Sequence, residues 1–341
     1  MKRCTVISLL LGLLMFGSLA IAQSAHTQEV IPAKLHNGYL VVVQGSIGNI
    51  SKRNFAIDTG AYPSVLDRSI AKKLQLVAKS EELRVVDRNL RSESVSVPDV
   101  EIGSLHASKV RMVVEDLVPI SESLGVHLDA IIGLDVLGAR NFRIDYKAKQ
   151  LIFNPADTLS MSAPLHQVDS MACVDLQVDE RPVRLLVDTA GASVLLFSNH
   201  LPWAASLPGT AHTYTNLGGT SRLRQTSVRS LALHKTSLGA ASISVSDAHN
   251  LSDFGFDGLL ATGILLVSKV EFDFAHQLFG WEPSSSKKDM QRIRETAQGR
   301  PPFSLGAAAH IPPSGLGPSS PCNVASGFCG YPTPFKSPSN K

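Results

Sequence analysis

Two aspartates stand at equivalent places in two similar stretches of this chain of 341 residues. Asp58 follows an apolar run and opens the phrase Asp-Thr-Gly-Ala, and Asp188 follows a second apolar run and opens Asp-Thr-Ala-Gly. Two carboxyl groups held about 3 Å apart cannot both ionise, so they share one proton. One is then a base for a bound water, and the other is an acid for a carbonyl oxygen. Such a pair is equipped for water attack on an amide.

A second landmark recurs downstream of each aspartate. Asp129-Ala-Ile-Ile-Gly133 follows the first, and Asp257-Gly-Leu-Leu-Ala261 follows the second. The stretch of chain from Asp58 to Asp188 is only slightly longer than the stretch from Asp129 to Asp257. Two landmarks in the same order at nearly the same offset indicate a duplicated domain. Asp129 and Asp257 are interpreted as turn-formers at strand ends and not as catalytic groups.

The elements that position these loops are expected to be strands. Short runs rich in Val, Ile and Leu, such as residues 39–43, 95–102 and 172–178, are separated by Gly, Asn, Asp and Ser. Strands at this spacing predict an all-β architecture. Residues 38–155 form the first predicted lobe and residues 164–283 the second, and about 120 residues is enough for a small core in each.

Helical pattern is scarce. Asp67 is a candidate N-cap for a short helix that runs through Leu74, just after the first Asp-Thr loop. Residues 198–204 are expected to form the counterpart in the second lobe. Residues 134–137 and 262–267 are each expected to form one helical turn.

The motif set resembles that of the retropepsin-like aspartic peptidases. It consists of Asp58-Thr-Gly-Ala61 after apolar residues, followed by Ile131-Ile132-Gly133. Two tandem copies in one chain resemble the two-lobe plan of the pepsins, and the resemblance covers residues 38–283. It implies two tandem retropepsin-like β-barrel lobes in a pepsin-like bilobed arrangement, with a cleft between them. It also implies an aspartic-type endopeptidase that acts on extended polypeptide and needs no metal or other cofactor.

The resemblance assigns roles residue by residue. Asp58 and Asp188 match the catalytic pair, and Thr59 and Thr189 match the threonines that bond across the two loops beneath it. The remaining loop positions are Gly60, Ala61, Ala190 and Gly191.

In such peptidases a β-hairpin flap follows each aspartate by about 25 residues. Here this places flaps near residues 84–93 and 214–220, and the second contains Leu-Gly-Gly-Thr, which suits a hairpin tip. The candidate tip residues are Arg88, Asn89, Leu217, Gly218 and Gly219.

The second copy departs from the family pattern at two positions. Ala190 stands at the third place of the Asp-Thr loop, and Ala261 stands where the first copy has Gly133. In the family both positions lie in one interlocking turn, so crowding near Asp188 is expected unless Gly191 and Gly263, which stand one and two residues later, relieve it. If the turn is crowded, replacing both alanines with glycine should raise activity. Two functions remain open: an active endopeptidase, and a catalytically silent peptide-binding module with a degenerate second lobe.

The residues after the two loops also bear on acidity. In pepsin-like sites a Ser or Thr follows Asp-Thr-Gly and donates a hydrogen bond to the carboxylate, which lowers its pKa. Ala61 and Gly191 have no such donor, although Ser193 is a nearby candidate. The sequence therefore predicts raised pKa values for the pair and an optimum from mildly acidic to near neutral.

The N-terminus has the form of a secretory signal. Lys2 and Arg3 precede an apolar run, and Ala20-Ile-Ala22 is a small-x-small cleavage site. Cleavage after Ala22 predicts an exported protein, periplasmic or extracellular, with no stable membrane insertion after removal of the signal. Residues 23–37 are a leader too short for a cleft-plugging propeptide.

The net charge of the chain and the composition of its C-terminal segment limit the classes of partner. The chain carries 32 Lys and Arg against 29 Asp and Glu, so its near neutrality argues against nucleic acid as a partner. With both lobes in one chain, a monomer is expected. Residues 284–341 are rich in Pro, Gly and Ser and predict a disordered tail. Cys322 and Cys329 lie in this tail and can pair in an oxidising compartment or remain reduced.

Overall fold

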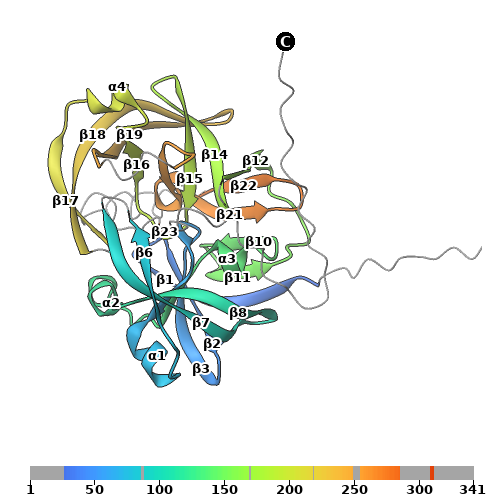
Figure 1. Ribbon diagram of the computed structural model, residues 1–341. Helices are drawn as coiled ribbons and strands as arrows, with labels where there is room; N and C mark the ends of the chain where they lie inside the picture. The colour runs from blue at the N-terminus through green and yellow to red at the C-terminus, as the bar shows by residue number, and fades with distance from the viewer. Residues whose placement is uncertain are drawn as a thin grey trace, which may run out of the picture.

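The computed structural model describes residues 27–85, 88–168, 170–217, 219–248, 254–284 and 308–310. Strands dominate these residues, and they form two lobes, one after the other along the chain (Figure 1). The all-β, two-lobe fold expected from the sequence is confirmed.

Lobe 1 is a set of strands with three short helices. The helices are α1 (Arg68–Lys73), α2 (Val118–Leu124) and α3 (Leu134–Leu137). The strands are β1 (Glu29–His36), β2 (Leu40–Ile47), β3 (Ile50–Ile57), β4 (Ala61–Tyr62), β5 (Val65–Asp67), β6 (Lys79–Arg84), β7 (Asn89–Ile102), β8 (Leu105–Glu115), β9 (Ala130–Ile132), β10 (Phe142–Asp145) and β11 (Gln150–Phe153).

Lobe 2 has a similar make-up. It contains helix α4 (Pro202–Ala205) and the 3-10 turn η2 (Thr262–Leu265). Its strands are β12 (Met161–Pro164), β13 (His166–Val168), β14 (Met171–Val178), β15 (Arg181–Asp188), β16 (Val194–Phe197), β17 (Thr210–Asn216), β18 (Gly219–Leu233), β19 (Thr236–Ser246), β20 (Gly258–Ala261), β21 (Val267–Asp273) and β22 (Leu278–Pro283). One further strand, β23 (Ala308–His310), follows in the C-terminal segment.

The two lobes share one strand order. Lobe 1 runs β2-β3-β9-β5-β8-β7-β6 with an extra β2–β7 pairing, and lobe 2 runs β14-β15-β20-β16-β19-β18-β17 with an extra β14–β18 pairing. In each lobe the strand that leads into the Asp-Thr loop pairs in parallel with the landmark strand, so Ile57 lies opposite Ile132 and Asp188 opposite Ala261. Each aspartate therefore stands at the end of a central strand with buried neighbours on both sides.

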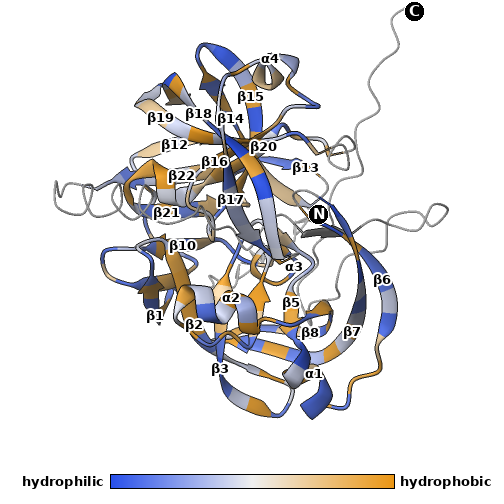
Figure 2. Cartoon of the chain, turned by 90° about the vertical axis from the view of Figure 1, so that its left-hand side faces the viewer, coloured by the Kyte–Doolittle hydropathy of each residue, from blue (hydrophilic) through white to orange (hydrophobic). Residues whose placement is uncertain are grey.

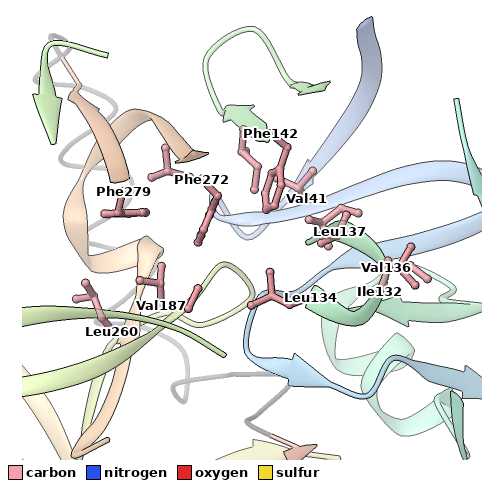
Figure 3. Close-up of a cluster of buried hydrophobic side chains, with 14 of the residues drawn as sticks. Val41, Ile132, Leu134, Val136, Leu137, Phe142, Val187, Leu260, Phe272 and Phe279 are labelled. Carbon is pink, nitrogen blue, oxygen red and sulfur yellow. The ribbon is translucent and has the colours of Figure 1, made fainter. Parts of the chain in front are cut away.

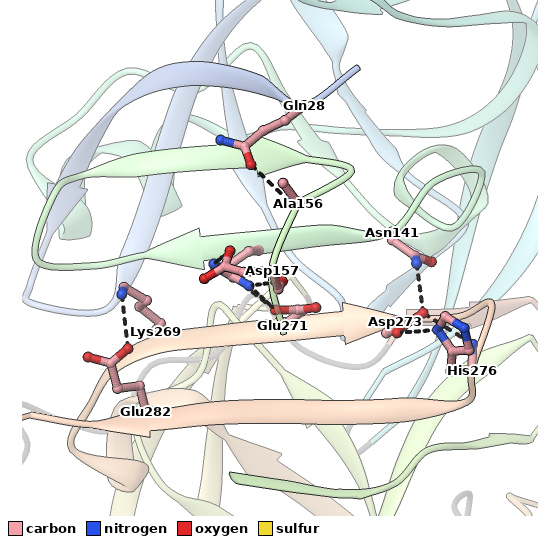
Figure 4. A network of polar contacts seen from close by, with 10 residues as sticks. Gln28, Asn141, Ala156, Asp157, Lys269, Glu271, Asp273, His276 and Glu282 are labelled. Atoms are coloured by element: carbon pink, nitrogen blue, oxygen red, sulfur yellow. Dashed lines mark hydrogen bonds and ion pairs between the residues drawn. The ribbon is translucent and has the colours of Figure 1, made fainter. Parts of the chain in front are cut away.

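A strand pairing joins the lobes away from the Asp-Thr loops. β10 of lobe 1 pairs antiparallel with β21 of lobe 2. Across this seam the buried Arg143 donates to Glu271 at 2.6 and 2.8 Å and to Asp157 at 2.9 Å. Figure 4 shows Asp157 and Glu271 at this seam between β10 and β21. Glu271 and Asp157 both accept hydrogen bonds from the guanidinium of Arg143, so the positive charge at the seam is paired.

The hydrophobic core is continuous through the seam. One buried cluster contains residues of both lobes, and the rings of Phe142 and Phe272 stack with centroids 4.8 Å apart (Figure 3). Val187 and Leu260, which precede the lobe 2 loops, belong to the same cluster. The strands that carry the loops are thus fixed to both lobes at once.

The helical predictions hold for three of four segments. Asp67 caps α1 by accepting a hydrogen bond from the backbone N–H of Ser69 at 2.9 Å, and Leu74 is its C-cap. The turns predicted at 134–137 and 262–267 are α3 and η2. The helix expected over 198–204 begins later, at Pro202, because Ser198 still donates to the backbone of Ser246 beside β16, and proline is suited to a first helical position.

The leader and the tail differ from expectation in part. The leader contains β1, which pairs with β2 and β11, so the first strand begins at Glu29 and not near Tyr39. The sequence missed it because its burial alternates only weakly, with Ile31 as its buried residue. Residues 308–310 of the predicted disordered tail form β23. The signal segment 1–22 and the cysteines at 322 and 329 lie outside the described residues.

Candidate active site

The two predicted catalytic aspartates lie together where the lobes meet. Asp58 and Asp188 are both fully buried. Each carboxyl accepts the backbone N–H two residues on at 2.8 Å, from Gly60 for Asp58 and from Ala190 for Asp188. A Cβ added to Gly60 would stand 3.1 Å from Cγ of Asp188, so the lobe 1 loop packs directly against the opposite carboxyl group.

The environment favours a proton on this pair. Burial, and then the charge of Asp188 beside it, raise the pKa of Asp58 well above its usual value. Oδ1 of Asp58 accepts from Gly60, whereas Oδ2 receives no donor from the described residues. The Asp188 carboxyl is the group that faces it, and a proton held between the two satisfies both. The absence of a donor after the loop, predicted from Ala61, agrees with this arrangement.

Two threonines tie the loops together beneath the aspartates. The backbone N–H of Thr59 donates to Oγ1 of Thr189 at 3.1 Å, and the N–H of Thr189 donates to Oγ1 of Thr59 at 3.2 Å. The Thr59 hydroxyl then donates to the carbonyl of Val187 at 2.6 Å, and the Thr189 hydroxyl donates to that of Ile57 at 3.0 Å. All four bonds are buried and cross between lobes. They fix the separation of the two carboxyl groups.

In lobe 1 the backbone of the Asp-Thr loop comes so close to the landmark that the landmark must end in glycine. A Cβ added to Gly133 would stand 2.1 Å from the carbonyl oxygen of Ala61, so only glycine fits. In lobe 2 the equivalent carbonyl, that of Gly191, lies close to Gly263, where an added Cβ would stand 2.9 Å away. A glycine two residues after the landmark position thus accommodates this carbonyl in lobe 2.

The crowding expected around Ala190 and Ala261 is not found. An added Cβ on Gly191 would stand 2.8 Å from Cβ of Ala261, so the glycine at 191 makes room for that methyl group. Lobe 1 pairs an alanine in the loop with a glycine in the landmark, and lobe 2 pairs a glycine in the loop with an alanine in the landmark. Because Ala190 keeps the same 2.8 Å bond to Asp188 as Gly60 makes to Asp58, the two loops position their carboxyl groups alike.

The hairpins expected to act as flaps are β6–β7 and β17–β18. Arg88 lies in the first turn, and Asn89 opens β7 opposite Arg84. Leu217 lies in the second turn, and Gly219 opens β18 with a φ of +96°. Gly218 lies outside the described residues.

The two hairpins meet. Figure 2 shows β17 extending from the upper lobe toward the lower one. The Arg88 side chain donates to the carbonyl oxygen of Thr220 at 3.0 Å, and Leu217 packs against the buried Leu83 and Val85 of lobe 1. Both hairpins therefore lie over the same region between the lobes.

Two supporting contacts were not predicted from the sequence. Ser64 donates to Asp135 at 2.6 Å and accepts from the N–H of Gly133 at 2.9 Å, which links the segment after the lobe 1 loop to the landmark. Tyr146 of lobe 1 reaches Thr262, next to the lobe 2 landmark, with 2.8 Å between the hydroxyl oxygens. Asp145-Tyr146 recurs as Asp273-Phe274, so a comparison of the two copies at that position was the available signal.

Asp129 and Asp257 have the structural role expected of them. Asp129 accepts from the backbone N–H of Asn54 at 2.7 Å, and Asp257 accepts from that of Arg184 at 2.8 Å. Each closes the start of its landmark strand onto the neighbouring central strand. Among the described residues, no group of three or more His, Cys, Asp or Glu side chains is arranged to hold a metal ion.

Comparison with known proteins agrees with the site in lobe 1. Residues 43–136 match a family model described as aspartyl protease. The resemblance seen in the sequence is confirmed. The matched segment contains Asp58, the first hairpin and the Gly133 landmark.

Two solved structures show the range of similarity. An aspartic proteinase from Irpex lacteus is 14% identical over 76% of this chain and 98% of its own, with a TM-score of 0.44. A retropepsin-like aspartic protease from Rickettsia conorii is 23% identical over 37% of this chain and 89% of its own, with a TM-score of 0.28. The search of curated proteins found no match.

Proposed function

We propose that this protein is an aspartic endopeptidase that hydrolyses peptide bonds with a water activated between Asp58 and Asp188. The observation that carries the proposal is the symmetric set of threonine bonds beneath two fully buried carboxyl groups. Such a set serves to hold two carboxyl groups at a fixed separation across a lobe boundary. A structural ion pair or a turn would not require it.

The chemistry follows from one proton shared by two carboxyl groups. The ionised carboxyl takes a proton from water as its oxygen attacks the peptide carbonyl, and the protonated carboxyl gives its proton to the carbonyl oxygen. The tetrahedral diol then collapses: the carboxyl group that took the proton of the water gives it to the amide nitrogen, the other carboxylate takes a proton from a diol hydroxyl, and the C–N bond breaks to leave a carboxylic acid and an amine. The raised pKa of Asp58 supplies the proton at a pH where ordinary aspartates are ionised.

The alternative is a peptide-binding module of the same fold without hydrolysis. It rests on the departures of the second lobe from the family pattern at Ala190 and Ala261. The matched bonds of Gly60 and Ala190, and the exchange of glycine and alanine between the lobes, support the peptidase over this alternative. Because both aspartates are fully buried, hydrolysis requires the segments that cover them to move and admit a substrate.

The test compares three single variants with wild type on a mixture of unstructured peptides. Asp58→Asn and Asp188→Asn should each reduce hydrolysis by about 10²–10⁴-fold, the range for loss of a general acid or base. Asp99→Asn, a charge change at an exposed site on β7, should leave the rate unchanged. Hydrolysis that survives both active-site variants would contradict the proposal, and so would full binding of peptide without any cleavage in wild type.

Export and a monomeric state are part of the same proposal. The support is the signal-like segment at residues 1–22 and the presence of both aspartates in one chain. Mass spectrometry of protein secreted by a host should find Gln23 as the first residue. Among the described residues, no helix is long and apolar enough to cross a membrane.

A further inference from the structure

The strand β23 has an unusual place in the sheet of lobe 1. It lies between β4, which follows the Asp58 loop, and β6, the first strand of the lobe 1 hairpin. Ala308 and Ala309 pair in parallel with Ala61 and Tyr62, while Ala309 and His310 pair antiparallel with Arg84 and Leu83. Figure 1 places the label of β23 beside that of β6, between the lobes.

Without β23, both neighbours would have an unpaired edge. β6 is the outer strand of its hairpin, and β23 is its described partner on that side. β4 has β23 as its described strand partner. An unpaired edge offers a row of N–H and C=O groups that an extended peptide can add to. The position between β4 and β6 is therefore built to hold one extended backbone.

Lobe 2 shows the same edge without an occupant. β17 corresponds to β6 and ends its sheet, and no other described strand pairs with its outer side. Among the described residues, the C-terminal segment adds to lobe 1, through β23. A general tendency of edge strands to pair would not make this distinction, because both hairpins offer an edge.

The direction of β23 relates it to the reaction. β4 begins at Ala61 and leads away from Asp58, and β23 runs parallel to it. A peptide bound in this position and direction has its N-terminal side toward the aspartates. The segment Ala308–His310 therefore matches the part of a substrate that lies on the C-terminal side of the bond to be cut.

We propose that residues 308–310 act as a built-in competitor that occupies the substrate position of lobe 1. The inference rests on the proposed peptidase function only for its effect on activity; the pairing itself does not depend on it. The segment belongs to the same chain and follows lobe 2 after the stretch from Ser284 to Ala308. Covalent linkage of this kind gives an effective concentration on the order of millimolar, so even a weak segment competes with free substrate. The segment must leave before a substrate can pair with β6.

The test uses the full chain with Ala309→Pro and, as the matched control, Ala309→Ser. Proline removes the backbone N–H of the residue that pairs on both sides and disfavours strand pairing, whereas serine keeps the N–H. Ala309→Pro should lower KM by about three- to ten-fold at unchanged kcat, because a tethered competitor at millimolar effective concentration is removed. Ala309→Ser should behave as wild type.

A second readout does not need activity. Hydrogen–deuterium exchange of the peptides that cover residues 59–64 and 79–85 should be faster in Ala309→Pro than in wild type and Ala309→Ser, while peptides from β17 should not change. Equal exchange in all three chains would overturn the proposal. Faster exchange in a chain that hydrolyses nothing would support the pairing and contradict the peptidase function, so the two failures are distinguishable.

A synthetic peptide with the sequence of residues 305–312 completes the test. Added to the Ala309→Pro chain, it should restore the slow exchange of residues 79–85 and raise KM for a reporter peptide without changing kcat. A peptide with proline at the position of Ala309 is its control. Inhibition by both peptides alike, or by neither, would contradict the assignment.

Discussion

The two lobes position their aspartates alike with different small residues. Lobe 1 places Ala61 against Gly133, and lobe 2 places Gly191 against Ala261. Each pair contains one methyl group. The bonds to the two carboxyl groups are then equal at 2.8 Å, and the crossed threonine N–H bonds are 3.1 and 3.2 Å long. In each lobe one of the two facing positions is glycine, and the two lobes place that glycine on opposite sides of the turn.

The lobes differ in what surrounds that shared geometry. The hairpin of lobe 1 pairs with β23, whereas that of lobe 2 ends its sheet among the described strands. Next to the lobe 2 landmark, the hydroxyl of Tyr146 meets Thr262, whereas the residue of lobe 2 that corresponds to Tyr146 in the sequence is Phe274, which has no hydroxyl. The two aspartates and the bonds that hold them are thus alike in both lobes, whereas the residues around them differ.

The exchange of glycine and alanine gives the largest expected effects. Gly133→Ala puts a methyl group 2.1 Å from the Ala61 carbonyl, and Gly191→Ala puts one 2.8 Å from Cβ of Ala261 and 2.7 Å from Oδ2 of Asp188. Each should reduce kcat/KM by about 10²-fold, as expected for a displacement of about 1 Å at a catalytic group. Steady-state hydrolysis of a reporter peptide measures this.

The double variant Gly191→Ala/Ala261→Gly recreates the lobe 1 pairing within lobe 2. It should recover only the part of the activity lost in Gly191→Ala that comes from the contact between the two methyl groups, because the added methyl group still stands 2.7 Å from Oδ2 of Asp188. Ala190→Gly/Ala261→Gly should be no faster than wild type, which reverses the expectation from sequence. A double variant as inactive as Gly191→Ala would show that the two lobes do not solve the turn in the same way.

The threonine bonds should contribute equally from both sides. Thr59→Val removes a hydroxyl that accepts from Thr189 and donates to Val187, and Thr189→Val removes its mirror image. Each leaves one buried N–H and one buried carbonyl without a partner, at a cost of about 1–3 kcal/mol for each group. Urea denaturation should give similar losses for the two variants, and Thr→Ser at either position should lose much less. If the losses in the free energy of unfolding differ by more than about twofold between Thr59→Val and Thr189→Val, the bonds of the two threonines are not equivalent.

The buried carboxyl pair should make stability fall as pH rises. The pKa of Asp58 is raised by folding, so its favourable protonated form is fully present below the unfolded pKa of about 3.9 and is lost as pH rises through the folded value. Asp58→Asn should therefore be more stable than wild type at pH 7, with a smaller difference at pH 4.

Asp99 provides a control of opposite sign. Hydrogen bonds from His106 and then Ser108 lower its pKa, so Asp99→Asn should bring no gain in stability at pH 7. Thermal unfolding of the three chains at both pH values decides the point. A stabilisation of Asp58→Asn that is independent of pH would mean that burial and charge are not its cause.

The smallest effect is expected from a change at Tyr146, whose hydroxyl contacts Thr262 next to the lobe 2 landmark. Tyr146→Phe makes the two lobes alike at this position and leaves Oγ1 of Thr262 without its partner, at a cost of about 1 kcal/mol. It should shift the pH profile of kcat/KM slightly while preserving the fold. A profile identical to wild type would assign Tyr146 a packing role only.

The sequence was sufficient for the parts of the fold that are written in local patterns. The Asp-Thr phrases, the landmark strands and the Asp67 cap each depend on a few adjacent residues, and they were predicted correctly. The hairpins were placed by distance from each aspartate, and both lie where expected.

The parts that were missed depend on contacts between distant segments. The fit of Ala261 is decided by Gly191, which lies far earlier in the chain, so no local pattern reports it. β1 and β23 have weak strand signals of their own and pair with edges that other segments provide. The ion pair of Arg143 with Glu271 likewise becomes visible only once β10 and β21 are paired.

The most direct test of the central claim is the pH dependence of kcat/KM for an unstructured peptide, measured for wild type and Asp188→Asn. A dyad that shares one proton should give wild type a bell-shaped profile, with an optimum between mildly acidic and near-neutral pH because burial and mutual repulsion raise the pKa of Asp58. Asp188→Asn should lose the activity at every pH. An optimum near pH 2, or a profile that persists in Asp188→Asn, would contradict catalysis by a buried pair drawn from both lobes.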